Sequence, residues 1–193
     1  MRRSVIEGRF AEGCAPAQGL MWVLTWRERE LMLFDLDTLE LRGVLGLPSE
    51  GWGLAHTPDR LIYSDGSSEL RWIDPEQTLS EQRLIITRSA QVRERSGELI
   101  YQLNELEWFE GYLLANIYLR EEIAVISLTD ARVALWVDLS ALRALEPPEA
   151  RELNGIAYDA QSDLIWVTGK GWSGRYALDA QALRAQITMI SSQ

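Results

Sequence analysis

The sequence contains very few of the residues that bind metals or form disulfides. Its 193 residues include a single cysteine, Cys14, and a single histidine, His56. One cysteine cannot form a disulfide within the chain, and the two residues are too few for a zinc site of cysteine and histidine ligands. His56 is followed by Thr57-Pro58, which is typical of a turn and argues against a histidine-dependent nucleophile. We therefore expect no metal and no other cofactor.

Long hydrophobic runs and positive charge are also scarce. No run approaches the roughly 18 apolar residues of a membrane span. Met1-Arg2-Arg3 is followed by Ser4-Val5-Ile6-Glu7, which lacks the apolar core of a signal peptide. The net charge of −10 disfavours nucleic acids and anionic membranes as partners. As written, the sequence predicts a cytoplasmic protein; a longer N-terminus with a signal peptide would instead direct it to the periplasm or outside the cell.

Lysine is nearly absent as well. Lys170 is the one lysine among 19 basic residues. A genomic preference for arginine would explain this bias without any function. The alternative is that position 170 needs an ammonium group, which is compact and can be tuned by burial, where a broad guanidinium would not serve.

Hydrophobic residues, in contrast, make up 47% of the chain and include 8 tryptophans, enough for a domain with a substantial core. They recur in four runs, at 20–26, 61–66, 113–117 and 164–169, each ending in a small polar cluster. A second apolar run and a turn follow each of these runs. A repeat of roughly 40–50 residues built from short strands is typical of a β-propeller. Residues 1–193 are therefore predicted to form one all-β domain with about four blades.

The stretch 103–118 shows this organisation most clearly. Two apolar-rich runs flank a turn at Glu110-Gly111 and predict a β-hairpin. The first strand of a hairpin starts at the edge where the second ends, so Asn104, Glu105 and Tyr118 are expected at one rim. In a propeller this rim is a mouth of the central channel. Topology places further residues of the other copies at the same mouth: Glu12 with Trp26, Trp52 with Gly66, and Asn154 with Lys170.

Three other segments give local predictions. Residues 138–145 have helical apolar spacing and precede Pro147-Pro148, so they predict one short helix. Residues 86–97 are polar and arginine-rich and predict a strand followed by a loop. The β-rich run Ile187-Thr188-Met189-Ile190 is expected to be a terminal strand, because the last strands of a propeller normally pair with N-terminal ones.

The residues at the predicted mouth also have structural explanations. Glu12 and Glu50 are consistent with solvated turn residues, and Asn104 and Asn154 with caps or turn formers. Most tryptophans lie within strand patterns and are expected to pack between blades. Three lie instead in glycine-rich or polar turns, namely Trp26, Trp52 and Trp172. The convergence of carboxylate, amide, ammonium and aromatic groups at one mouth favours a functional site.

An ordered set of motifs resembles the glutamine cyclotransferases of the plant and bacterial type, a family of five-bladed propellers that are glutaminyl cyclases. The resemblance spans residues 10 to about 178. Its motifs are Phe10-Ala11-Glu12-Gly13, Leu24-Thr25-Trp26, Gly51-Trp52-Gly53-Leu54, Ser64-Asp65-Gly66, Leu103-Asn104-Glu105-Leu106-Glu107, Ala115-Asn116, Leu153-Asn154-Gly155-Ile156-Ala157-Tyr158 and Thr168-Gly169-Lys170.

The resemblance implies an enzyme that converts the N-terminal glutamine of peptides or proteins to pyroglutamate and releases ammonia without a metal. It implies that Glu12 is the acid/base carboxylate, and that Asn104 and Lys170 bind polar groups at the reacting centre. It also implies that Trp26 and Trp52 line the pocket. The full set of predicted substrate-binding residues is Phe10, Trp26, Trp52, Tyr118, Asn154 and Trp172.

The sequence departs from the family pattern at three places. Tyr118 stands where the family usually has tryptophan, and Ala11 replaces a glycine. The family's first motif, Phe-Thr-Gln-Gly-Leu, has no counterpart, so about one of five blades has no match. The alternative prediction is therefore a catalytically impaired propeller of the same family that binds peptides or acts as a scaffold. In either case, open blade edges are expected to allow self-association.

Overall fold

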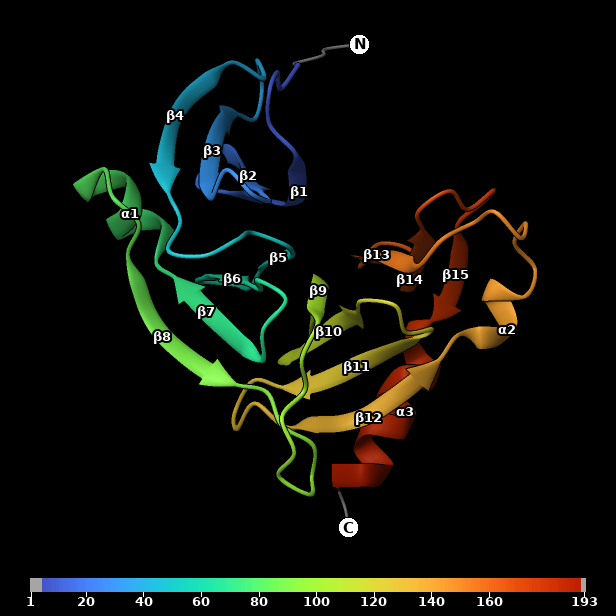
Figure 1. Cartoon of the computed structure of the whole chain (residues 1–193). Helices are drawn as coiled ribbons and strands as arrows, with labels where there is room; N and C mark the ends of the chain where they lie inside the picture. Colours follow the sequence, from blue (N-terminus) through green and yellow to red (C-terminus); the bar gives the residue numbers. More distant parts are fainter. Residues whose placement is uncertain (1–4, 192–193) are drawn as a thin grey trace.

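The computed structural model describes residues 5–191, and it arranges four antiparallel sheets one after another around an arc (Figure 1). In each sheet the strands follow chain order, from the centre of the arc outwards. The first sheet contains β1 (Ala11–Ala17), β2 (Leu20–Thr25), β3 (Glu30–Asp35) and β4 (Leu41–Gly46). The second contains β5 (Leu54–His56), β6 (Leu61–Tyr63), β7 (Glu69–Ile73) and β8 (Ile86–Gln91).

The third sheet contains the predicted hairpin, and the fourth has three strands. Strands β9 (Leu103–Phe109), β10 (Tyr112–Ile117), β11 (Glu122–Ser127) and β12 (Val133–Asp138) form the third. Strands β13 (Leu153–Asp159), β14 (Leu164–Gly169) and β15 (Tyr176–Asp179) form the fourth. These sheets confirm the predicted β-propeller arrangement with four blades, and the hairpin at 103–118 is confirmed with its turn at Glu110-Gly111.

The blades pack face to face because alternate strand residues point to opposite sides of each sheet. One buried cluster joins the first and second sheets and includes Trp22, Leu24 and Tyr63. A second joins the middle sheets, and a third joins the third sheet, the fourth sheet and the C-terminal helix. The two middle blades therefore bury both of their faces.

The innermost strands and connections of neighbouring blades approach each other closely. Gly13 N donates to the carbonyl oxygen of Trp52 at 2.7 Å, and Gly66 N donates to that of Leu103 at 3.2 Å, so backbone hydrogen bonds connect neighbouring blades. A Cβ atom at Gly53 would lie 2.0 Å from the carbonyl oxygen of Asn104. Only glycine therefore permits this approach between the second and third blades.

Two short helices lie in the connections. Helix α2 (Ser140–Arg143) confirms a short helix within 138–145, and β8 confirms the strand predicted at the start of 86–97. Helix α1 (Pro75–Glu81) begins where the sequence predicts only a turn, after the second apolar run of the second copy. The Asp74 carboxylate accepts the N–H of Gln77 at 2.9 Å, and proline suits the first helical position.

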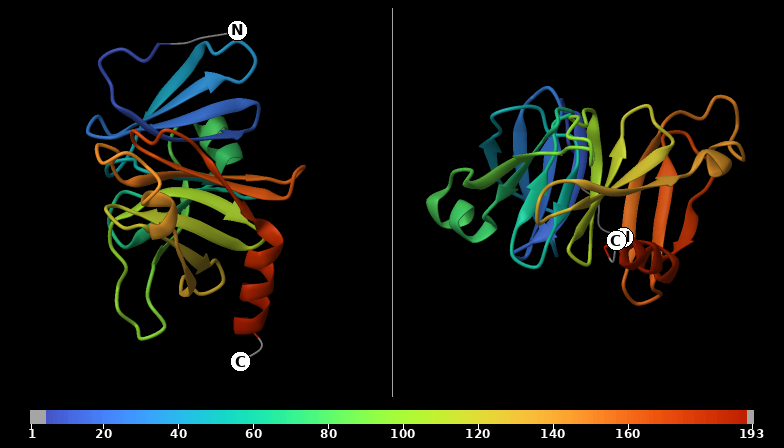
Figure 2. Two further views of the ribbon diagram at one scale, coloured as in Figure 1. Left: turned by 90° about the vertical axis from the view of Figure 1, so that its right-hand side faces the viewer. Right: turned by 90° about the horizontal axis from the view of Figure 1, so that it is seen from below.

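The prediction of a terminal strand at 187–190 is wrong, because these residues belong to helix α3 (Ala180–Ser191). Leu183 and Ile187 lie one helical turn apart and are both buried against the last two sheets. Figure 2 shows the helix alongside these sheets at the C-terminal end of the chain. Within residues 5–191, no helix is long and apolar enough to cross a membrane.

Candidate active site

A cavity of about 380 Å³ lies where the inner ends of all four blades meet. Seven of the nine residues singled out in the sequence line it. Phe10, Glu12 and Trp26 come from the first blade, Trp52 from the start of the second, Asn104 and Tyr118 from the third, and Lys170 from the fourth. Arg151 and Glu152 complete the lining.

Four aromatic side chains form the wall of this cavity as two edge-to-face pairs. The ring centroids of Phe10 and Trp26 are 5.6 Å apart, and those of Trp52 and Tyr118 are 5.8 Å apart. The guanidinium of Arg27 lies 4.1 Å from the centroid of the Trp26 ring. Edge-to-face contacts favour defined ring orientations within each pair.

The β9–β10 hairpin places Asn104 and Tyr118 at the same rim. Tyr118 N donates to the carbonyl oxygen of Gln102 at 2.9 Å, just beyond the end of β10. The hydroxyl of Ser64 donates to the carbonyl oxygen of Asn104 at 2.7 Å and accepts the N–H of Gly53 at 2.9 Å. The second blade thus fixes the backbone that carries Asn104, which is itself buried.

Glu12 and Lys170 line the same cavity although they are far apart in the sequence. Burial raises the pKa of Glu12, the positive charge of Lys170 opposes this, and the negative charge of Glu152 adds to it. Lys170 Nζ lies 3.5 Å from Oε1 of Glu152. A partly buried carboxylate with a raised pKa is a stronger base than an exposed carboxylate, which suits acid/base chemistry.

The sequence did not indicate Glu152 or Arg151 as residues of the site. The N–H of Lys170 donates to the carbonyl oxygen of Glu152 at 3.0 Å, and the N–H of Arg151 donates to that of Lys170 at 2.8 Å. This pairing just beyond β13 and β14 brings Glu152 next to Lys170. The register between the two strands determines which residue lies next to Lys170. No sequence signal marked Glu152 as that residue.

Two further carboxylates, Glu105 and Glu107, lie on β9. Burial is the largest cause of the raised pKa of Glu105, to about 8, and the charges of Glu107 and Glu12 add to it. Burial raises the pKa of Glu107 to about 7, and a hydrogen bond from the backbone of Tyr158 opposes that rise. Glu105 and Glu107 extend the acidic character of the site from Glu12 along the third blade.

Asn154 and Trp172 lie outside the lining of the cavity. The indole of Trp172 packs directly on Gly169, where a Cβ atom would lie 2.1 Å from Nε1. Its N–H donates to the carbonyl oxygen of Arg151 at 3.0 Å, and its ring meets Tyr176 edge-on at 5.9 Å. The indole therefore packs within the last blade and supports the strand end before Lys170.

Asn154 lies on β13, and its buried Nδ2 atom has no hydrogen-bond partner among residues 5–191. The proposed substrate-binding roles of Asn154 and Trp172 stay predictions. Across the same described residues, no group of three or more histidine, cysteine, aspartate or glutamate side chains could hold a metal ion.

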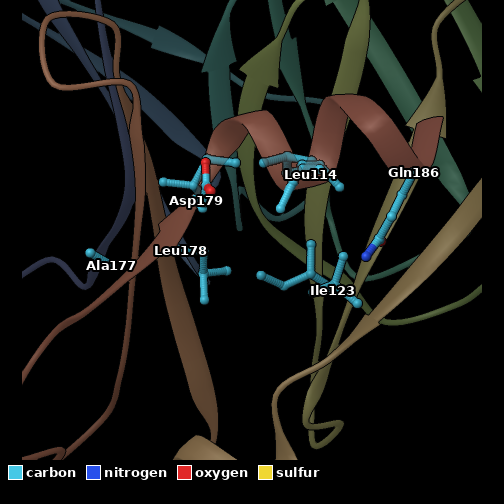
Figure 3. Close-up of a pocket in the computed structure, with 10 residues that line it drawn as sticks. Leu114, Ile123, Ala177, Leu178, Asp179 and Gln186 are labelled. Atoms are coloured by element: carbon cyan, nitrogen blue, oxygen red, sulfur yellow. The ribbon is translucent and has the colours of Figure 1, made fainter. Parts of the chain in front are cut away.

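A second cavity of about 350 Å³ lies between the third sheet, the fourth sheet and α3 (Figure 3). Its lining is largely aliphatic, with Leu114 and Ile123 facing Leu178. Its one carboxylate, Asp179, accepts the N–H of Gln181 at 2.8 Å at the start of α3. This second cavity therefore offers few polar groups for catalysis, and the cavity around Glu12 is the candidate active site.

Comparison with known proteins identifies relatives of this chain. A family model described as glutamine cyclotransferase matches residues 1–179. A glutaminyl-peptide cyclotransferase from Arabidopsis thaliana is 32% identical over 182 residues, which are 92% of this chain and 55% of the relative. The chain thus spans about half the length of that curated relative.

Solved structures agree with this assignment. The crystal structure of Myxococcus xanthus glutaminyl cyclase superposes with a TM-score of 0.79 at 30% identity, covering 89% of this chain and 73% of the other. The WD40 domain of Toxoplasma gondii coronin superposes with a TM-score of 0.55 at 11% identity over 86% of this chain and 42% of its own, which shows the propeller fold alone. Since the family match extends over nearly the whole sequence, the chain belongs to the glutamine cyclotransferase family.

Proposed function

We propose that this chain is a glutaminyl-peptide cyclotransferase, which converts the N-terminal glutamine of a peptide to pyroglutamate and releases ammonia without a metal. The observation that carries the proposal is the meeting of Glu12 and Lys170, from the first and last blades, in one cavity with four aromatic walls. A carboxylate, an ammonium and the Asn104 amide are the polar groups that this reaction needs, and the aromatic rings exclude water from it.

The reaction takes place within one residue of the substrate. The α-amine nitrogen attacks Cδ of its own side-chain amide and forms the new C–N bond, which gives a tetrahedral intermediate. The bond from Cδ to the amide nitrogen then breaks, and ammonia leaves. The attacking nitrogen must lose a proton and the leaving nitrogen must gain one. Glu12 transfers that proton between the two nitrogens, and its raised pKa suits both steps.

The rest of the cavity orients the substrate and stabilises charge. The aromatic wall folds the flexible glutamine side chain towards a ring, and orientation of this kind can lower a barrier by several kcal/mol, up to roughly 7–11 kcal/mol in the best model reactions. The Lys170 ammonium and the Asn104 amide N–H groups donate to the carbonyl oxygen, on which negative charge develops in the intermediate.

Substitution of the acid/base carboxylate tests the proposal. We expect Glu12→Gln to lower kcat for the dipeptide Gln-Phe by at least about 100-fold, because the amide cannot transfer the proton. A coupled ammonia assay measures the rate, with Phe-Gln as the control substrate and exposed Glu149→Gln as the matched control variant. Turnover by Glu12→Gln close to that of the unsubstituted chain would remove Glu12 from the mechanism.

The same assay tests the metal-independent chemistry. We expect the rate to persist in excess chelator. Loss of the rate in chelator and its recovery with zinc would contradict a reaction carried by Glu12, Asn104 and Lys170. A chain that binds Gln-Phe but releases no ammonia would instead be the peptide-binding propeller.

A further inference from the structure

One carboxylate outside the cavity connects two of its aromatic walls. Glu50 lies in the connection between β4 and β5, two residues before Trp52, and is half-buried. Its Oε2 atom accepts the indole N–H of Trp26 at 2.8 Å and the indole N–H of Trp52 at 3.0 Å. Both bonds end on the same oxygen, and they come from different blades.

The two bonds turn the separate aromatic pairs into a continuous wall. Phe10 contacts Trp26 edge-on, and Trp52 contacts Tyr118 edge-on. With Glu50 between the two indoles, the contacts run without interruption from the first blade to the third.

The backbone around Glu50 is also constrained. Gly51 N donates to the carbonyl oxygen of Thr25 at 3.0 Å, and Trp52 N donates to that of Ser64 at 3.0 Å. The Trp52 ring packs against Gly66, where a Cβ atom would lie 2.7 Å from the ring. The Glu50 side chain therefore starts from a backbone that is tied to both blades.

Such bonds are strong determinants of ring orientation. An indole has one N–H donor and no acceptor, so a partly buried indole needs an acceptor in one direction. Hydrogen bonds to a carboxylate are shorter and roughly twice as strong as those between neutral groups. One carboxylate oxygen that accepts two indoles consequently fixes the position of each ring relative to the other.

We propose that Glu50 is a positioning residue of the active site, which holds Trp26 and Trp52 at the separation that folds the glutamine side chain for ring closure. Glu50 does not line the cavity and exchanges no proton with the substrate. The kinetic part of this inference rests on the proposed cyclotransferase function, whereas the geometric part does not.

Nuclear magnetic resonance of the indole N–H groups tests the geometric part. The signals of Trp26 and Trp52 are assigned with Trp26→Phe and Trp52→Phe. We expect Glu50→Ala to move both signals, because both lose the same acceptor, and Glu149→Ala to move neither. Glu50→Gln keeps an oxygen at this position and should retain most of the effect on both signals. Unchanged Trp26 and Trp52 signals in Glu50→Ala would overturn the inference.

Kinetics test the positioning role. We expect Glu50→Ala to lower kcat/KM for Gln-Phe at least about tenfold, and Glu50→Gln to restore it to within a few-fold. The pH dependence of kcat/KM should stay unchanged in both variants. A Glu50→Gln loss as large as that of Glu50→Ala, a shifted pH profile, or full activity of Glu50→Ala would each overturn the role.

The two proposals fail in distinguishable ways. If the unsubstituted chain releases no ammonia, the cyclotransferase proposal fails while the indole signals still test the geometry. Calorimetric affinity for Gln-Phe then replaces the rate, with the same expected order of variants. Equal affinity of Glu50→Ala and the unsubstituted chain would then overturn the positioning role.

Discussion

Lys170 lies near two carboxylates, Glu152 and Glu12, which differ in their surroundings. Its ammonium pairs with Glu152, whose side chain is only 9% exposed. Burial raises the pKa of Glu12, and the charge of Lys170 opposes that rise. A compact ammonium can serve both groups and still donate to a substrate oxygen. A planar guanidinium is broader, is always charged and directs its donors in a fixed fork.

We therefore expect Lys170→Arg to lower kcat/KM for Gln-Phe at least about tenfold with little change in Tm, because the group is partly exposed and the charge is kept. The coupled ammonia assay and a thermal melt measure the two quantities. Lys170→Ala should lose at least as much activity. If both variants retain full activity, Lys170 has no role at the reacting centre.

Glu105 gives a prediction on stability. Its pKa in the folded protein is about 8, above the ordinary 4.5, so the folded state binds more protons than the unfolded state between these values. The contribution of Glu105 to stability is then greatest at the acid end of this range and falls as pH rises towards 8. Glu105→Gln removes this titration. We expect it to raise Tm at pH 8 much more than at pH 5, and an equal change at both pH values would contradict the raised pKa.

The residue scale also shows what the sequence can predict. Asn104 and Tyr118 could be placed together because a hairpin fixes which strand ends share an edge. Glu12 and Trp26 likewise follow from one β1–β2 pair. The partners of Glu152 and Glu50 could not be predicted in this way. Glu152 lies beside Lys170 because of the register between β13 and β14, and Glu50 reaches Trp26 and Trp52 because two blades are in contact. No local pattern encodes either of these.

At the scale of elements, helix α3 shows tertiary contacts overriding local propensity. Ile187-Thr188-Met189-Ile190 has the β-branched composition of a strand. Arg184, however, bonds both to Glu110 in the β9–β10 turn and to Asp163 in the β13–β14 connection, each at 2.9 Å. These anchors and the buried Leu183 and Ile187 exist only in the folded chain, so the helix could not be predicted from composition.

The anchoring of α3 gives the prediction at this scale. Arg184 Nη2 also donates to the hydroxyl of Tyr158 at 2.8 Å, so one side chain connects the helix to two blades. We expect Arg184→Ala to lower Tm by a few degrees and to speed hydrogen exchange in α3 before the inner strands. Arg184→Lys, which cannot reach all three partners at once, should give an intermediate effect. Unchanged exchange in α3 would show that apolar packing alone holds it.

At the scale of the whole molecule, the first and last sheets are the ends of the arc, and each packs against one neighbouring blade. The repeat in the sequence predicted this order of blades, because each copy carries the same alternation of strands and turns. The repeat could not predict the position of the fourth blade relative to the first at the mouth. That position depends on the rotation between each pair of neighbouring blades, and these rotations add up around the arc.

The cavity is the place where a ligand would connect these ends directly. A peptide bound in this cavity would contact Glu12 and Trp26 of the first blade and Lys170 of the fourth blade at once. Binding to the folded state alone stabilises by about 2.7 kcal/mol at a ligand concentration of 100 Kd, and a chain of this size then melts roughly 5–10 °C higher. We expect this rise with Gln-Phe in the Glu12→Gln variant, whose slow turnover should leave the substrate intact during the melt, and no rise with Phe-Gln. Hydrogen exchange should slow in β1 and in β13–β14 together. Protection confined to one end blade would show that the ligand does not bridge the arc, and would move its binding site away from the meeting of Glu12 and Lys170.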